Sequence, residues 1–209
     1  MPKRGYKKKP LTKREYAAMA RVANKQIHKQ SELKCFDGVN TSMTIRTTAN
    51  VQKINPPAQG NGSSSRDGDS IYIRSFSLNA TLSPDNAQNT IQRVILFQWL
   101  ENDATAPVVG DILEETGSAM GMLHSFYVTN PQKQFKVLDD RLVYHDSNNA
   151  SNGKPYRVRV KSGDLAIRKP DYDAAAITGR GVLYLLLVGD SATDGTLQTP
   201  ISRLRYFDN

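Results

Sequence analysis

Two segments, Ile71-Tyr-Ile-Arg-Ser-Phe-Ser-Leu-Asn-Ala-Thr-Leu82 and Ile91-Gln-Arg-Val-Ile-Leu-Phe-Gln-Trp-Leu100, decide the fold. Both are rich in the β-branched and aromatic residues that favour strands. Between them, residues 83–89 supply Pro, Asp and Asn, which are typical of turns. The sequence therefore predicts two long strands joined by one turn, in an all-β protein.

Each of these strands carries a further signal in its apolar pattern. In the first, the apolar phase shifts between Ile73 and Phe76, which predicts a β-bulge. In the second, apolar residues occupy both faces, with Ile95 and Phe97 on one and Leu96 on the other. A strand with apolar residues on both faces is buried on both faces. We expect a packed sheet on one side and a neighbouring subunit on the other.

The remaining chain adds short strands separated by polar connections. A short helix is predicted at 106–115, and loops or turns at 55–69, 117–130 and 148–153. Residues 33–36 can open another strand, and residues 164–167 can form a short one. Further strands are predicted at 47–54, 134–146, 156–161, 182–190 and 201–207. About eight strands with this spacing predict a sandwich of the eight-stranded single jelly-roll type.

Charge divides the chain into two parts. Residues 1–30 hold ten Lys and Arg and one acid, Glu15, a formal charge of +9. The other 179 residues hold 18 basic and 19 acidic groups, a formal charge of −1. This division predicts a basic arm, 1–30, that meets a polyanion, and a shell domain, 31–209, that meets copies of itself.

The arm itself changes character at Thr12. Residues 1–11 carry too much charge to fold alone. Thr12 and Glu15 then fit a capping box, and residues 12–29 have the apolar spacing of an amphipathic helix with a basic stripe. The alternative for this helix is an ordinary solvated surface. The preceding Lys7-Lys8-Lys9 tract favours nucleic-acid binding, and the predicted contacts are Lys3, Arg4, Lys7, Lys8, Lys9, Lys13, Arg14, Arg21, Lys25 and Lys29.

A second group of cations lies in the predicted shell domain. Residues 156–161 alternate strictly, so that Arg157, Arg159 and Lys161 share one face of a strand. Two interpretations remain open: these cations contact phosphates, or they pair with acids of a neighbouring strand or subunit.

Other chemistry is poorly supported. The three histidines lie far apart, no His or Cys pattern predicts a metal, and no nucleophile elbow is present. Asp139 and Asp140 are neighbours in a predicted strand, so they point to opposite faces and cannot share a site. We therefore predict no catalytic residues, no metal and no cofactor. The longest apolar run, 182–188, is too short to span a bilayer, so no membrane partner is expected.

Several short motifs follow one another along the chain in a characteristic order. They are the basic arm with its helix, Arg66-x-Gly68-Asp69-x-Ile71-x-Ile73, Arg93-x-Ile95-x-Phe97-x-Trp99 with Asn102, Tyr127-x-x-Asn130-Pro131-x-x-x-Phe135-x-x-Leu138-x-Asp140, and Gly189-Asp190-Ser191. This order resembles single jelly-roll viral capsid proteins, specifically the satellite tobacco necrosis virus coat protein family and the capsid proteins of small circular single-stranded DNA (CRESS-DNA) viruses. The likeness spans nearly the whole chain.

The resemblance implies a function. It implies a T=1 icosahedral shell of sixty copies, with the arm facing inward on a small single-stranded DNA or RNA genome. It implies a place in the virion, and in the host nucleus for a DNA virus or the cytoplasm for an RNA satellite. A nuclear-import signal at Lys7 to Arg14 would suit the DNA case. Satellite coat proteins bind calcium between subunits, and Asp208 matches one acid there, but the other ligands do not match.

Two other functions stay open at this level. The first is a non-viral jelly-roll module that binds single-stranded nucleic acid through a basic tail. The second is a carbohydrate-binding jelly roll, which the single Trp99 supports poorly because it lies inside a predicted strand.

Overall fold

The computed structural model describes residues 12–30, 33–84, 89–101, 105–129, 134–146, 148, 153–172, 179–192 and 195–208, with side chains of the first range described up to residue 23. The chain divides into two compact units, 1–32 and 33–209. The elements are α1 (Lys13–Gln30), β1 (Leu33–Val39), β2 (Met43–Ile45), β3 (Asn50–Lys53), β4 (Ile71–Ser83), β5 (Thr90–Trp99), η1 (Val109–Asp111), α2 (Ala119–His124), β6 (Phe135–His145), β7 (Lys154–Lys161), β8 (Leu183–Gly189) and β9 (Gly195–Asp208).

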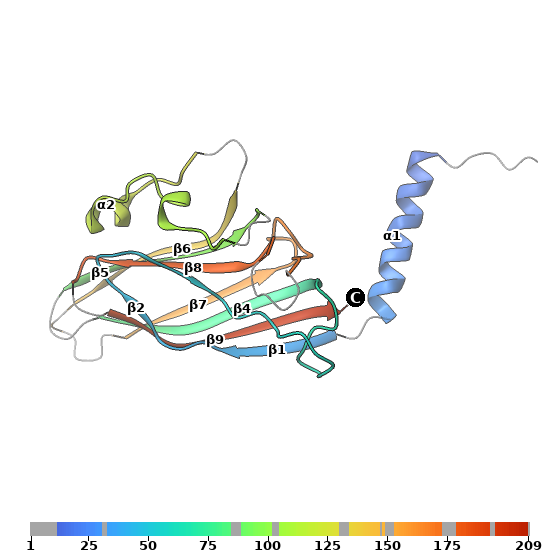
Figure 1. Ribbon diagram of the computed structural model, residues 1–209, viewed down its shortest axis with the longest axis horizontal. Coiled ribbons are helices and arrows are strands. Elements are labelled where there is room, and N and C mark those ends of the chain that lie inside the picture. The colour runs from blue at the N-terminus through green and yellow to red at the C-terminus, as the bar shows by residue number, and fades with distance from the viewer. Residues whose placement is uncertain are drawn as a thin grey trace, which may run out of the picture. The chain divides into compact units, whose positions relative to one another are not determined.

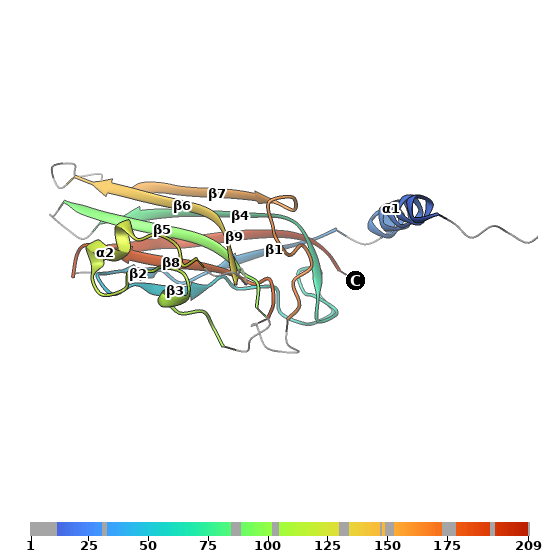
Figure 2. The same cartoon turned by 90° about the horizontal axis from the view of Figure 1, so that it is seen from above.

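Unit 33–209 is built on two antiparallel sheets packed face to face (Figures 1 and 2). The first sheet has the order β1-β9-β4-β7, with β2 also paired to β9, and the second has the order β3-β8-β5-β6. Side chains that alternate along the strands of both sheets form one buried core between them. The predominantly β architecture predicted from the sequence is confirmed.

The described residues contain nine strands, one more than expected. β1 and β2 pair with β9 in a single continuous register, from Leu33 opposite Phe207 to Ile45 opposite Gly195. The ladder is interrupted where β9 contains Pro200, which has no N–H to donate, and Thr199, whose φ is 41°. One ladder interrupted by a local backbone irregularity therefore appears as two strands.

The two strands that decide the fold lie where the sequence places them, but in different sheets. β4 pairs with β7 and β9, whereas β5 pairs with β6 and β8. The predicted bulge in β4 is confirmed, because the register against β9 shifts between Ile73 and Ser75. The connection between β4 and β5 therefore crosses from one sheet to the other.

The second face of β5 is covered by the chain itself. Segment 105–129, which includes η1 and α2, lies over the second sheet (Figure 1) and buries Ile112, Leu113, Met122 and Leu123. The expectation that a neighbouring subunit covers this face is wrong. The apolar residues on this face of β5 are covered by segment 105–129, and the local periodicity of β5 does not show which segment covers it.

Arg93 of β5 fastens that layer to the sheet. Its Nη1 donates to the carbonyl oxygens of Met122, Leu123 and Ser125, at 2.9, 3.3 and 3.0 Å. Its Nε and Nη2 donate to the two carboxylate oxygens of Asp140 on β6, at 3.1 and 2.8 Å. A buried cation thus satisfies the last carbonyls of a helix that has only six residues.

Three local predictions are corrected. The helix expected at 106–115 is only the single turn η1, closed by a 2.8 Å bond from the Val108 N–H to the Asp111 carboxylate. The loop expected at 117–130 contains α2, whose first turn is capped by Ser118 accepting from Gly121 N–H at 3.0 Å. The strand expected at 47–54 is shorter, Asn50–Lys53, and two strands precede it.

A fourth correction concerns 164–167, which forms no strand. The buried side chain of Gln98 takes the place of a partner strand there. Its Oε1 accepts from Ala166 N–H and Ile167 N–H, both at 3.0 Å, and its Nε2 donates to Ile167 and Gly181 carbonyls at 2.8 and 2.9 Å. One amide side chain provides the backbone hydrogen bonds of this segment, which a propensity pattern cannot distinguish from pairing with a strand.

Candidate nucleic-acid interface

The predicted arm contacts fall on both described and undescribed residues. Lys3, Arg4, Lys7, Lys8 and Lys9 lie outside the described residues. Lys13, Arg14 and Arg21 are exposed side chains on α1. The backbone positions of Lys25 and Lys29 follow on the same helix, with their side chains outside the described set.

Helix α1 begins with reciprocal hydrogen bonds between Thr12 and Glu15. Thr12 N–H donates to Glu15 Oε2 at 2.7 Å, and Glu15 N–H donates to Thr12 Oγ1 at 3.4 Å. The hydrogen bond from the Thr12 backbone, followed by the one from its hydroxyl, holds the pKa of Glu15 below its ordinary value of 4.5. The capping box therefore has the geometry that the sequence predicts.

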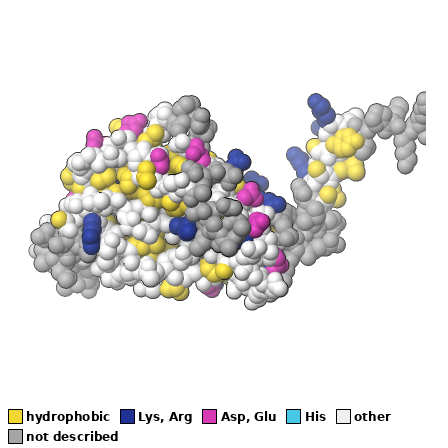
Figure 3. Space-filling view, in the orientation of Figure 1, with side chains coloured by type: hydrophobic (Ala, Val, Ile, Leu, Met, Phe, Trp, Pro, Cys, Tyr) yellow, Lys and Arg dark blue, Asp and Glu magenta, His cyan; other side chains and the backbone are white. Residues whose placement is uncertain are grey.

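Cationic and apolar side chains occupy different sides of this helix. Arg14 and Arg21 are seven residues apart and share one face, while Tyr16, Met19 and Ala23 recur on another. Figure 3 shows dark blue and yellow side chains on different sides of α1. Tyr16 and Met19 are 60% and 57% exposed. The helix thus presents a basic stripe and an exposed apolar stripe within its own unit.

The cations of β7 lie on the outer face of the first sheet, which points away from the second sheet. Tyr156, Val158 and Val160 are buried in the core, so Arg157, Arg159 and Lys161 point outward. The predicted sharing of one face is confirmed. β7 has a single partner in its sheet, β4.

β4 offers these cations no acid to pair with. In the β4–β7 register, Lys161 lies opposite Ser75, Arg159 opposite Ser77 and Arg157 opposite Asn79. Pairing with acids of the neighbouring strand is therefore excluded as the reason for these cations.

A second cationic row lies on the other side of β4. In the β4–β9 register, Ser75 also faces Arg205, and Ser77 also faces Arg203. The sequence pattern places Arg203 and Arg205 in a predicted strand, 201–207, but does not bring them next to β7. Only the pairing order β9-β4-β7 puts the two rows on one face, since the strands are separated by tens of residues along the chain.

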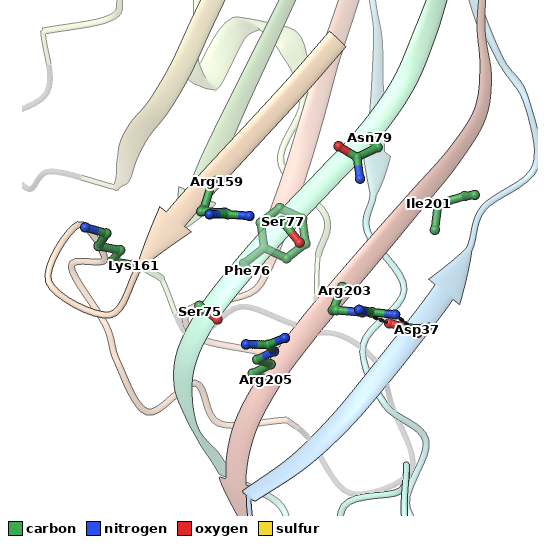
Figure 4. Close-up of a pocket in the computed structure, with 10 residues that line it drawn as sticks. All are labelled: Asp37, Ser75, Phe76, Ser77, Asn79, Arg159, Lys161, Ile201, Arg203 and Arg205. Atoms are coloured by element: carbon green, nitrogen blue, oxygen red, sulfur yellow. Dashed lines mark hydrogen bonds and ion pairs between the residues drawn. The ribbon is translucent and has the colours of Figure 1, made fainter. Parts of the chain in front are cut away.

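An open groove of about 500 Å³ is lined by cations from both rows and by polar residues of β4: Arg159, Lys161, Arg203, Arg205, Ser75, Ser77 and Asn79. Figure 4 shows Arg159 from β7 and Arg205 from β9 extending toward the serines of β4. Asp37 of β1 closes the far side. Its carboxylate accepts from Arg203 Nε and Nη2 at 2.7 and 2.6 Å, and this hydrogen-bonded pair lowers the pKa of Asp37. The groove therefore has cations on both sides of a polar row, and one of them is paired.

Asp208 does not fit a metal site within one chain. Its Oδ2 accepts from Lys34 Nζ and from Asp67 N–H, both at 2.8 Å, and the hydrogen bond to Asp208 raises the pKa of Lys34. Its Oδ1 has no partner in the described structure, but a dication there would share the carboxylate with an ammonium. Among the described residues, no three His, Cys, Asp or Glu side chains gather in a way that could hold a metal.

The other candidate chemistries are placed as follows. Asp139 pairs with Arg141 at 3.0 Å and Asp140 with Arg93 at 2.8 Å, so the two acids serve separate ion pairs, as predicted. Trp99 is 4% exposed, which leaves no indole face for stacking on a sugar. None of the helices in the described part of the chain is long and apolar enough to cross a bilayer.

Comparison with known proteins gives a family match and likenesses to solved structures. The family model described as satellite tobacco necrosis virus coat protein matches residues 1–209. A search of curated proteins finds no match. A solved chain described as Desmodium yellow mottle tymovirus is similar at 9% identity and a TM-score of 0.40, covering 98% of this chain and 92% of that chain.

The family match spans every residue of the chain, including the basic arm and both sheets. It agrees with the resemblance read from the ordered motifs, and it favours a coat protein over a non-viral nucleic-acid-binding module or a carbohydrate-binding module. The chain belongs to the satellite tobacco necrosis virus coat protein family and is a viral coat protein, a component of the virion.

Proposed function

We propose that sixty copies of this coat protein assemble into a T=1 icosahedral shell and package a small single-stranded genome through arm 1–30. The observation that carries the proposal is the division of charge, +9 on the arm and −1 on the rest of the chain. Like-charged bodies would repel one another when packed in a shell, whereas a nearly neutral body can pack against copies of itself.

The topology supports the shell part of the proposal. With β1 and β2 taken as one interrupted strand, the sandwich has eight strands in the two sheets β1/β2-β9-β4-β7 and β3-β8-β5-β6. Consecutive strands alternate between the sheets except at β5–β6. We interpret this as an eight-stranded jelly roll. A closed shell then follows from repeated contacts between identical bodies.

The arm supplies the cations for packaging. Sixty arms of charge +9 place about 540 positive charges in one shell, each able to displace a counterion from a phosphate. The contacts we propose are the ten Lys and Arg of residues 1–30. Because these cations contact phosphates and not base edges, packaging is nearly independent of the nucleotide sequence and sensitive to salt. The Lys7–Arg14 segment serves nuclear import if the packaged genome is DNA.

Electron microscopy and deletion of the arm test this proposal. The full chain should form uniform shells about twenty nanometres wide, the size for sixty compact subunits. Deletion of residues 1–30 should leave a folded body that still associates, because the buried core lies within 33–209. The deleted protein should carry little nucleic acid by its absorbance ratio. A full nucleic-acid load after deletion, or a body that stays monomeric at high concentration, contradicts the proposal. Nuclease digestion identifies the packaged genome as DNA or RNA.

A further inference from the structure

Outward-facing cations on the first sheet remain unexplained by the arm-based proposal. Arg157, Arg159, Lys161 and Arg205 are exposed, and none is in an ion pair within the described part of the chain. Arg203 adds a fifth cation, and Asp37 is the one acid lining the groove. Among the described residues, four of these cations line the groove with Asp37, namely Arg159, Lys161, Arg203 and Arg205, which gives the lining a formal excess of +3 in a body whose total is close to neutral. Arg157 lies beside the groove, opposite Asn79.

We propose that the groove on the outer face of the first sheet is a second binding site for the phosphate backbone of single-stranded nucleic acid. The groove has Arg159 and Lys161 on one side, Arg205 on the other, and Ser75, Ser77 and Asn79 between them. Arg157 extends the β7 row beside the groove, opposite Asn79. This inference rests on the proposed packaging function and assigns part of it to the body instead of the arm.

The spacing of the cations suits a regular polyanion. Outward residues of β7 recur every second position, about 6.6 Å apart, and the β7 and β9 rows lie two strand spacings apart, about 9.6 Å. A single-stranded nucleic acid in extended form, lying along β4, therefore passes between two rows of cations. It can place successive phosphates beside successive cationic side chains. An acidic protein surface would need its carboxylates at the same repeat to match both rows.

The floor of the groove suits phosphate oxygens. Ser75 and Ser77 bring hydroxyl donors and Asn79 brings an amide donor, all on β4 between the rows. The arginines can donate two parallel N–H bonds to one phosphate. The residues that line the groove include no carboxylate on the floor, and Asp37 is already held by Arg203 at its border. Asp37 therefore repels phosphate only at the β1 side of the groove, which confines the bound nucleic acid to the region over β4.

The main test measures the binding of a labelled oligothymidylate to the full chain, at protein concentrations where sedimentation shows single subunits. Arg159→Gln with Arg205→Gln removes two phosphate contacts. We expect about tenfold weaker binding near 0.15 M salt and a slope of log affinity against log salt that is smaller by about 1.4. Lys53→Gln with Lys136→Gln is the matched control, because it removes the same charge from the second sheet.

A single position provides a sharper comparison. Ser77 lies between Arg159 and Arg203 and points outward. Ser77→Glu places a carboxylate in the middle of the polar row, while Ser77→Gln places a neutral group of nearly the same size there. The carboxylate variant should bind the oligonucleotide several-fold more weakly than the amide variant, with equal thermal midpoints for unfolding.

The outcomes separate this inference from the proposed function. Lys7→Gln, Lys8→Gln and Lys9→Gln together test the arm in the same assay. If the arm variant loses affinity and both groove variants bind as the unaltered chain does, the groove inference is overturned while arm packaging stands. If groove variants change only the sedimentation of the protein, the face contacts another copy and the inference is likewise overturned. If the groove variants lose affinity and the arm variant does not, arm packaging fails and the groove stands.

Discussion

Two arginines of this protein form bidentate pairs with a carboxylate in very different surroundings. The Arg93 side chain is 8% exposed, and its guanidinium also bonds three carbonyl oxygens of segment 105–129. The Arg203 side chain is 53% exposed, and its partner Asp37 is 48% exposed. Burial, not pair geometry, decides how much each pair contributes to the free energy of unfolding, since water competes more strongly for the exposed Arg203 pair than for the Arg93 pair.

We expect Arg93→Ala to lower the free energy of unfolding by about 3 kcal/mol. The substitution removes the charged partner of the Asp140 carboxylate, which among the described residues keeps only the Tyr127 hydroxyl as a donor, and it removes the side-chain donor of the Leu123 and Ser125 carbonyls. Arg203→Ala should leave the free energy of unfolding nearly unchanged. Urea unfolding of the two variants, followed by Trp99 fluorescence, gives the comparison. Equal effects of the two substitutions would mean that Arg93 does not fasten the covering layer.

At the scale of elements, α1 depends on its first turn. An isolated helix of 18 residues is marginally stable in water. The capping box between Thr12 and Glu15 therefore has a measurable effect on the helix content of α1. The pKa of Glu15 is lowered in the helix by the hydrogen bonds from Thr12. A carboxyl group with a lowered pKa stabilises the helix above its ordinary pKa and ceases to do so as the pH falls through the lowered one.

The helix content of a peptide spanning residues 1–32 should therefore be constant above about pH 5 and decrease on acidification below the ordinary pKa of Glu15. Circular dichroism measures this decrease. The Glu15→Gln peptide is the reference for this decrease, because its amide does not titrate and its other ionisable groups are the same. The decrease should be larger in the unaltered peptide than in the variant. A peptide in which acid raises the helix content would refute the role assigned to the carboxylate.

At the scale of the whole molecule, the charge on the arm should set how much nucleic acid a particle carries. Replacing Lys7, Lys8 and Lys9 with Gln changes the formal charge of the arm from +9 to +6. The nucleic-acid load per particle should fall by about one third, because each lost cation no longer neutralises a phosphate. Phosphate analysis of purified particles measures the load. An unchanged load would show that the arm charge does not limit packaging.

Much of the architecture was predictable because its determinants are local. Period-two patterns and a high content of β-branched residues predict the strands β4, β5, β6, β7 and β8. The phase shift between Ile73 and Phe76 predicts the bulge in β4. Of the misplaced elements, segment 164–167 has its determinant in a distant residue, whereas η1 has its determinant within its own turn. Segment 164–167 is held by Gln98, and η1 stops after one turn that the Asp111 carboxylate closes.

The sequence by itself determined the all-β character, the alternation of β7 and the separation of a +9 arm from a nearly neutral body. Each is a property of neighbouring residues or of composition. Only the tertiary structure decided that segment 105–129, and not another subunit, covers β5, and that Arg159 and Arg205 flank one row of serines on β4. The first result depends on the packing of segment 105–129 over the second sheet, and the second depends on the order of strands in the first sheet. That order is set by packing between segments distant along the chain, and no local pattern encodes it.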